Sequence, residues 1–102
     1  MVRVTWTATS LRQLEDIRVY IGRDSQFQAK RVCLQIRDSV RKLREHPNYG
    51  AKVPEFADAT IREIRIYQYR IVYQFNEEDE LARVLAVVHG ARKLTKDLLE
   101  PV

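Results

Sequence analysis

The sequence predicts an α+β domain in which an N-terminal strand and a helical hairpin precede a three-stranded antiparallel meander. Both helices are expected on one face of the resulting twisted sheet. Apolar residues recur at helical intervals as far as residue 46 and at strand intervals from residue 61 onward. The length of 102 residues provides one core of ordinary size and is too short for two. We therefore expect a single domain over residues 1–102.

The first strand and the first helix follow directly from the opening residues. The stretch "VRVTW", residues 2–6, alternates apolar and polar side chains, as a half-buried strand does. Ser10 then stands three residues before Gln13, which is the spacing of a capping box. Leucines and isoleucines recur at helical spacing from there to Gly22, so an amphipathic helix is predicted over this span.

A second, longer helix is predicted from a repeat of the same pattern. Ser25 and Gln28 form another capping-box pair, and an apolar stripe continues until His46, just before Pro47. Between residues 30 and 44 the helix carries six basic residues and one acidic residue, mostly off the apolar stripe. Such a run is typical of a solvated helix face.

Three strands are predicted after the connection "KVPEFADAT": "IREIRI" (61–66), "YRIVYQF" (69–75) and "LARVLAVVH" (81–89). The intervening "YQ" suits a tight hairpin, and "NEEDE" suits a polar turn that begins at Asn76. The last strand is apolar at nearly every position, so we expect it inside the sheet. The tail, about residues 93–102, is expected to form a short helical turn or to stay mobile. Four aromatic residues are expected in the core: Trp6, Tyr20, Phe56 and Phe75.

Composition narrows the classes of function. The single cysteine, Cys33, and the two histidines show no metal-ligand spacing, so we expect no metal, no cofactor and no internal disulfide, and a cytoplasmic location. No apolar run is long enough to span a bilayer, and the N-terminus lacks the apolar core of a signal peptide. The net charge of +4 favours an anionic partner, either nucleic acid or an acidic protein.

Several stretches, taken in order, carry a family resemblance. "LEDIRVYI", "LREHPNYG", "VPEF", "IREI", "YRIVYQF" and "VVHGAR" together resemble the RelE/ParE superfamily of toxins from type II toxin-antitoxin systems. The resemblance runs from Val2 to about Arg92. It implies a growth-inhibiting toxin held inactive in a hetero-oligomer with a cognate antitoxin.

The resemblance implies two alternative targets. ParE-like members inhibit DNA gyrase and have no catalytic activity of their own, whereas RelE-like members are endoribonucleases that cleave mRNA on the ribosome. Ribonuclease members typically carry a C-terminal tyrosine or a cluster of lysines in the central strands. This chain has no tyrosine after Tyr73 and no lysine between Lys52 and Lys93. The gyrase reading is therefore favoured, and the ribosome-dependent endoribonuclease remains the alternative.

If the chain is a ribonuclease, its chemistry needs a base, an acid and cations beside the phosphate. Glu55 and His89 are the candidates for base and acid, and Arg70 is the central candidate for a phosphate contact. Arg62 and Arg92 are further candidates for binding RNA or another target. His89 is also a candidate structural residue at the end of a strand.

Arg70 is unusual because it lies inside an otherwise apolar and aromatic strand. Strand alternation places it with Val72 on the face opposite Ile71 and Tyr73. We expect that face to hold the functional or antitoxin-binding surface. The alternatives are that Arg70 extends to solvent or pairs with Glu63.

Overall fold

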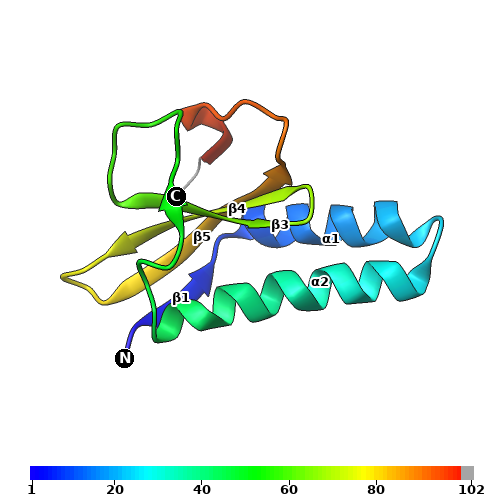
Figure 1. Cartoon of the computed structure of the whole chain (residues 1–102), viewed down its shortest axis with the longest axis horizontal. Coiled ribbons are helices and arrows are strands. Elements are labelled where there is room, and N and C mark those ends of the chain that lie inside the picture. The colour runs from blue at the N-terminus through cyan, green and yellow to red at the C-terminus, as the bar shows by residue number, and fades with distance from the viewer. Residues whose placement is uncertain (100–102) are drawn as a thin grey trace.

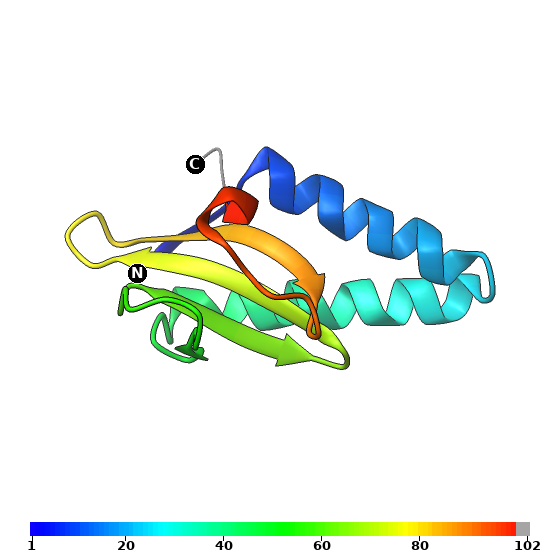
Figure 2. The same cartoon turned by 90° about the horizontal axis from the view of Figure 1, so that it is seen from above.

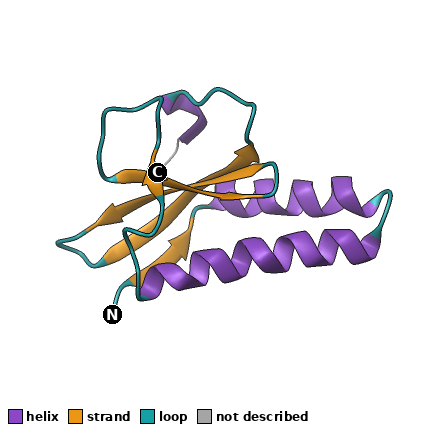
Figure 3. Cartoon of the chain, in the orientation of Figure 1, coloured by secondary structure: helices purple, strands orange, loops and turns teal. Residues whose placement is uncertain are grey.

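The computed structural model describes residues 1–99 and has the predicted architecture. In chain order the elements are β1 (Arg3–Trp6), α1 (Ala8–Gly22), α2 (Gln26–Arg41), the 3-10 turn η1 (Lys42–Arg44), β2 (Ala51–Lys52), β3 (Ile61–Ile66), β4 (Tyr69–Asn76), β5 (Leu81–His89) and the 3-10 turn η2 (Lys96–Leu99). Figure 1 and Figure 3 show both long helices on one side of the sheet. Neither helix within the described residues combines the length and the apolarity that a bilayer span requires.

Five strands form one sheet in the order β1-β5-β4-β3-β2. β1 pairs in parallel with β5, and the other neighbouring pairs are antiparallel. The predicted interior position of the last strand is confirmed, because β5 lies between β1 and β4. β2 was not predicted, since it is a two-residue strand at the beginning of the polar connection. The two-residue hairpin between β3 and β4 is confirmed, and Tyr67 adopts a positive φ of 54° within it.

The start of α1 differs from the prediction. Thr7, not Ser10, caps the helix, and its hydroxyl accepts a hydrogen bond from the backbone N–H of Ser10 at 3.1 Å. The Oε1 of Gln13 instead accepts the backbone N–H of Val87 at 2.8 Å. Gln13 can reach this N–H because β1 pairs with β5 only as far as Val84. Gln13 therefore satisfies an edge N–H that β1 is too short to reach.

The second helix begins as predicted and ends in a 3-10 turn. The side chain of Ser25 caps α2 by accepting the N–H of Gln28 at 3.1 Å. After Arg41 the chain continues through η1 to Arg44, which lies before Pro47 as expected. The basic residues of this segment are exposed, in agreement with a solvated helix face.

Each face of the sheet has its own apolar cluster. The helix-facing cluster includes Val32, Ile36, Val40, Ile71 and Tyr73. The second cluster lies on the opposite face and consists of Val53, Ile61, Val72, Leu85, Ala86, Val88, Leu94 and Leu99. A register shift between Val72 and Tyr73 of β4 places Leu85 and Ala86 of β5 in the same cluster. Residues on both faces of β5 are thus buried, which explains its nearly continuous apolar sequence.

The second cluster is covered by irregular chain. Figure 1 and Figure 2 show the connection after β2 and the C-terminal segment (residues 90–99) on the side of the sheet opposite the helices. Within this segment Leu94 and Leu99 are buried, and η2 provides the predicted helical turn. The part of the predicted tail at residues 100–102 lies outside the described residues.

One of the four aromatic core predictions is wrong. Trp6 and Phe75 pack against the helix-facing cluster and Phe56 packs against the second cluster. Tyr20, however, is 67% exposed. Figure 1 shows the helical hairpin extending past the end of the sheet, so apolar side chains near the helix-helix turn have less sheet to pack against.

Candidate functional site

Arg70 is the centre of a buried ion-pair cluster. Its Nε donates to Glu63 Oε1 at 2.6 Å, and its Nη1 and Nη2 donate to the two oxygens of Glu55 at 2.7 and 2.8 Å. The side chains of Arg70, Glu63 and Glu55 are 3%, 5% and 16% exposed. A guanidinium that forms a two-bond fork with one carboxylate and contacts a second has few donors left for another anion.

The cluster also joins the C-terminal segment to the sheet. Arg70 Nη1 donates to the backbone oxygen of Arg92 at 3.3 Å, and the N–H of Leu94 donates to Glu55 Oε2 at 3.0 Å. The bonds from Arg70, followed in importance by the Leu94 N–H, lower the pKa of Glu55 to about 2 against the effect of burial. The pKa of Arg70 is raised, chiefly by its bonds to Glu55. The cluster thus connects β3, β4, the connection after β2 and the C-terminal segment.

This geometry corrects one expectation and confirms an alternative. Arg70 does share a face with Val72, as predicted. That face, however, carries the buried second cluster and is not an open surface. The predicted pairing of Arg70 with Glu63 is present. Glu55 is ionised, and both its oxygens accept hydrogen bonds. Sequence reasoning had not placed Glu55 beside Arg70 in an ion pair, because 14 residues separate them in the chain.

His89 lies on the other face of the sheet. It pairs with Tyr69 across β4 and β5, and the two rings make an edge contact with centroids 6.2 Å apart. Tyr69 belongs to the helix-facing cluster, whereas the next residue, Arg70, points to the opposite face. The Nδ1 of His89 accepts the N–H of Ala91 at 3.1 Å, so an imidazole holding this bond carries its proton on Nε2.

His89 and Arg92 border one groove of about 370 Å³ between α1 and the end of β5. Its other lining residues include Asp16, Ile17 and Tyr20 of α1. Glu55 and Arg62 do not line this groove. The structure therefore brings two of the predicted site residues together here.

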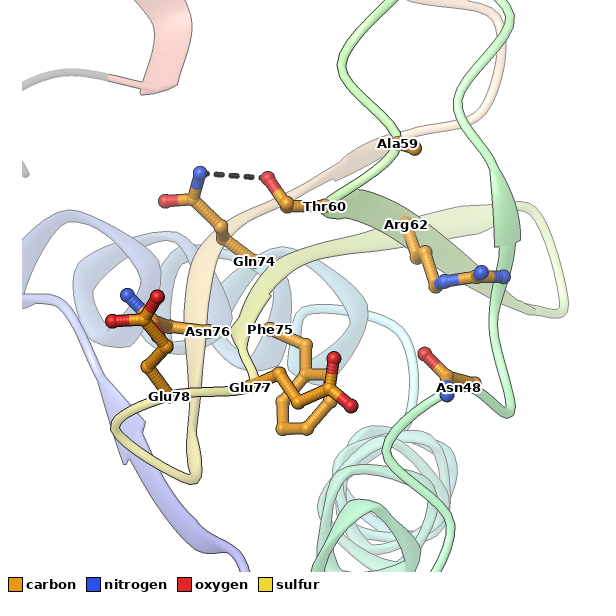
Figure 4. A pocket seen from close by; sticks show the side chains of 9 residues that line it. All are labelled: Asn48, Ala59, Thr60, Arg62, Gln74, Phe75, Asn76, Glu77 and Glu78. Carbon is orange, nitrogen blue, oxygen red and sulfur yellow. Dashed lines mark hydrogen bonds between the residues drawn. The ribbon is translucent and has the colours of Figure 1, made fainter.

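Arg62 lies in a different groove, of about 570 Å³, at the end of the sheet near the β4–β5 turn. Its Nη1 donates to the backbone oxygen of Gly50 at 2.9 Å. Figure 4 shows Arg62 and Asn48 at one side of this groove and the acidic Glu77 and Glu78 at the other. The groove therefore presents mixed charges and is not a uniformly basic surface.

The comparison with protein families decides the identity of the chain. The family model that matches residues 4–94 is that of the ParE toxin of the type II toxin-antitoxin system parDE. The chain belongs to the ParE toxin family. The toxin is therefore a member of the RelE/ParE superfamily, as its sequence motifs implied.

Two curated relatives match the toxin over most of its length. Toxin RelE2 of Caulobacter vibrioides is 32% identical over 92 residues, which cover 90% of this chain and 99% of that protein. Putative toxin Y4kP of Sinorhizobium fredii is 30% identical over 90 residues, covering 86% of this chain and 88% of that protein. One relative thus carries a RelE-type name, whereas the family model that matches the chain is that of the ParE toxin.

Solved structures share the toxin's fold at lower identity. A chain of the chromosomal ParDE system of P. aeruginosa superposes with a TM-score of 0.70 at 17% identity, covering 87% of this chain and 96% of that one. The isolated RelE toxin of E. coli gives a TM-score of 0.67 at 19% identity, covering 91% and 88%. At this identity the similarity establishes the fold alone.

The predicted site residues thus lie in three places. Arg70 and Glu55 belong to the buried cluster, His89 and Arg92 to the groove beside α1, and Arg62 to the groove near the β4–β5 turn. Glu63 was named from the sequence only as an alternative partner of Arg70, and its burial was not predicted. Among residues 1–99, no three His, Cys, Asp or Glu side chains gather as a metal site would need.

Proposed function

We propose that this toxin arrests growth by binding and inhibiting DNA gyrase, and that it does so without catalysis of its own. The observation that carries the proposal is the separation of the candidate catalytic groups. The candidate acid, His89, lies on one face of the sheet, whereas the candidate base and phosphate ligand, Glu55 and Arg70, are bound to each other on the opposite face. General acid-base cleavage of RNA needs these groups around one phosphate.

Three further observations support the proposal. The guanidinium of Arg70 is occupied by Glu55 and Glu63, so a phosphate would have to displace a buried carboxylate to reach it. The family model that matches the chain is that of ParE. The absence of a tyrosine after Tyr73 and of lysines between Lys52 and Lys93 agrees with the same reading.

We also propose that a cognate antitoxin neutralises the toxin in the cytoplasm by forming a hetero-oligomer with it. Three of the solved structures that share the fold are complexes of a toxin with its antitoxin: RelBE2 of Mycobacterium tuberculosis, RelBE of E. coli and RelE-RelB of Pyrococcus horikoshii. A stable pair of this kind buries roughly 1,200 Å² or more. Co-expression with the product of the neighbouring gene tests this proposal through copurification and rescue of growth. Failure of both would contradict it.

The target is tested by inducing the toxin without antitoxin and measuring gyrase supercoiling and mRNA integrity in parallel. We expect inhibited supercoiling and intact mRNA. His89→Ala should leave toxicity nearly unchanged, because no proton transfer is required of the toxin. Loss of a catalytic acid would instead slow RNA cleavage by about 10²-fold or more.

The ribonuclease alternative has a distinct signature in the same experiment. Ribosome-dependent mRNA fragments that disappear in His89→Ala, together with unaffected supercoiling, would contradict gyrase inhibition and support mRNA cleavage. His46→Ala is a matched control, since His46 is the chain's other histidine and is exposed in the loop after η1. It should have no effect under either mechanism.

A further inference from the structure

Three arginines form a row on the C-terminal half of the second helix. Arg37 and Arg41 of α2 and Arg44 of η1 are all exposed and line one small groove together with Val4, Trp6 and Val40. Their i, i+4 and i+7 spacing keeps them on one side of the helix, about 6 Å of helical rise separating the first two. We call Arg37, Arg41 and Arg44 the arginine row.

The arginine row has many donors that the protein does not use. Within residues 1–99, the side chains of Arg37 and Arg44 form no ion pair, and Arg41 pairs with Asp38 at the exposed surface. The guanidinium of Arg37 lies over the ring of Trp6, with its Cζ 5.9 Å from the ring centroid. This stacking orders Arg37 and leaves its N–H groups available to an anion.

We propose that the arginine row is a docking surface for the phosphate backbone of duplex DNA. Guanidinium groups bind phosphate oxygens through paired hydrogen bonds, and a row of three matches an extended anion. The groove encloses only about 140 Å³, whereas small-molecule pockets typically enclose about 300 Å³ or more. A polymeric anion lying across the row therefore fits better than a free nucleotide.

The state of Trp6 favours a duplex over a single strand. Proteins that bind single-stranded nucleic acid stack the bases on exposed aromatic rings. Here Arg37 covers the ring of Trp6, the only tryptophan of the chain. Contacts made by the row would go to phosphates and would be independent of base sequence. This binding requires no gyrase, so it can be measured independently of the toxin's target.

The test is fluorescence anisotropy of a labelled 20-base-pair DNA duplex titrated with the purified full chain at 50 to 200 mM salt. Three phosphate contacts predict a slope of about −2.7 in log affinity against log salt, which is about a 40-fold loss of affinity over this range. The intrinsic fluorescence of Trp6 should change in the same titration, because its ring lies against Arg37. Unchanged Trp6 fluorescence at saturation would overturn the proposal.

Variants separate this surface from general basic charge. Arg37→Ala/Arg41→Ala/Arg44→Ala should weaken duplex binding about 10-fold or more at 50 mM salt and abolish most of the salt dependence. The matched control, Arg12→Ala/Arg23→Ala/Arg31→Ala, removes the same charge from exposed positions on α1, on α2 and in the turn between them. It should retain both the affinity and the salt dependence. Equal losses in the two variants would overturn the proposal. Urea unfolding confirms that each variant is folded.

Two further arms test the identity of the partner. Tighter binding of single-stranded or duplex RNA than of duplex DNA would contradict the choice of DNA. The cognate antitoxin is the second arm. If the row variant loses antitoxin binding but keeps its DNA affinity, the surface belongs to the antitoxin and the proposal fails. Retained antitoxin binding with lost DNA affinity is the expected result.

Discussion

The side chain of Arg70 is 3% exposed and binds two carboxylates, whereas the three exposed guanidiniums of the arginine row together bind one carboxylate among residues 1–99. Both settings are built from the same type of side chain in one small domain. Arg70 is surrounded by the second cluster and by the C-terminal segment. The arginine row lies where α2 passes the edge strand β1, with solvent around it.

This difference separates structural from recognition chemistry. A buried charge requires partners within the protein, so the interactions of Arg70 stabilise the fold and leave little capacity for a ligand. An exposed guanidinium contributes little to stability and keeps its donors for a partner. Mutation of Arg70 should therefore lower the stability of the fold, whereas mutation of the arginine row should weaken partner binding and change stability little.

The largest effect is expected from Arg70→Met, which removes the cation but keeps much of the side-chain volume. The change leaves Glu63 buried and Glu55 mostly buried without their partner, so the free energy of unfolding should fall by about 3 to 5 kcal/mol. Urea unfolding followed by circular dichroism measures this loss.

A compensated variant is the control for Arg70→Met. Adding Glu55→Gln and Glu63→Gln removes both orphaned charges and should recover a large part of the lost stability. If Arg70→Met alone unfolds at the same urea concentration as the parent, the ion-pair cluster is not the stabilising element described above.

A smaller effect is expected from pH. The pKa of Glu55 is lowered from 4.5 to about 2 in the folded protein, chiefly by its bonds with Arg70. A lowered pKa means that the folded state favours the ionised carboxylate. The contribution of Glu55 is therefore complete above about pH 5 and is lost as the pH falls toward 2. The loss should amount to about 1 to 3 kcal/mol, allowing for the partial exposure of the group.

Urea unfolding at several pH values between 2 and 6 tests this contribution. Glu55→Gln should flatten that part of the profile, because it removes the titrating group. Glu78→Gln removes the same charge from an exposed position in the β4–β5 turn and serves as the control. A profile as steep in Glu55→Gln as in Glu78→Gln would assign the acid sensitivity to other carboxylates.

Periodicity predicted most of the fold because local pattern determines local structure in this chain. The isoleucine-rich stretch of residues 61–66 and the apolar run of residues 81–89 each predicted the correct strand, and Ser25 marked a true helix start. Ser10 failed as a cap because Thr7 and β1 determine where α1 begins. The strand β2 has only two residues, too few to show a period.

The candidate site was harder to predict because it depends on contacts between distant segments. Strand alternation correctly placed Arg70 opposite Ile71, but no local pattern shows that residues 90–99 fold over that face. Glu55 and Leu94 come together through this covering alone. The basic residues of the second helix were likewise evident from the sequence, but their sequence positions do not show that Trp6 lies beneath Arg37.

The smallest effect is expected at the arginine row itself, in the Arg41–Asp38 pair. Both side chains are more than 60% exposed, and the Nη1 of Arg41 lies 2.7 Å from Asp38 Oδ1. An i, i+3 pair at such a surface is screened by water and salt, so Arg41→Ala should lower the free energy of unfolding by no more than about 0.5 kcal/mol. A double-mutant cycle with Asp38→Ala measures the coupling directly. Coupling above about 1 kcal/mol would show that Arg41 resembles Arg70 as a structural residue, and the distinction between the two regions would then fail at this position.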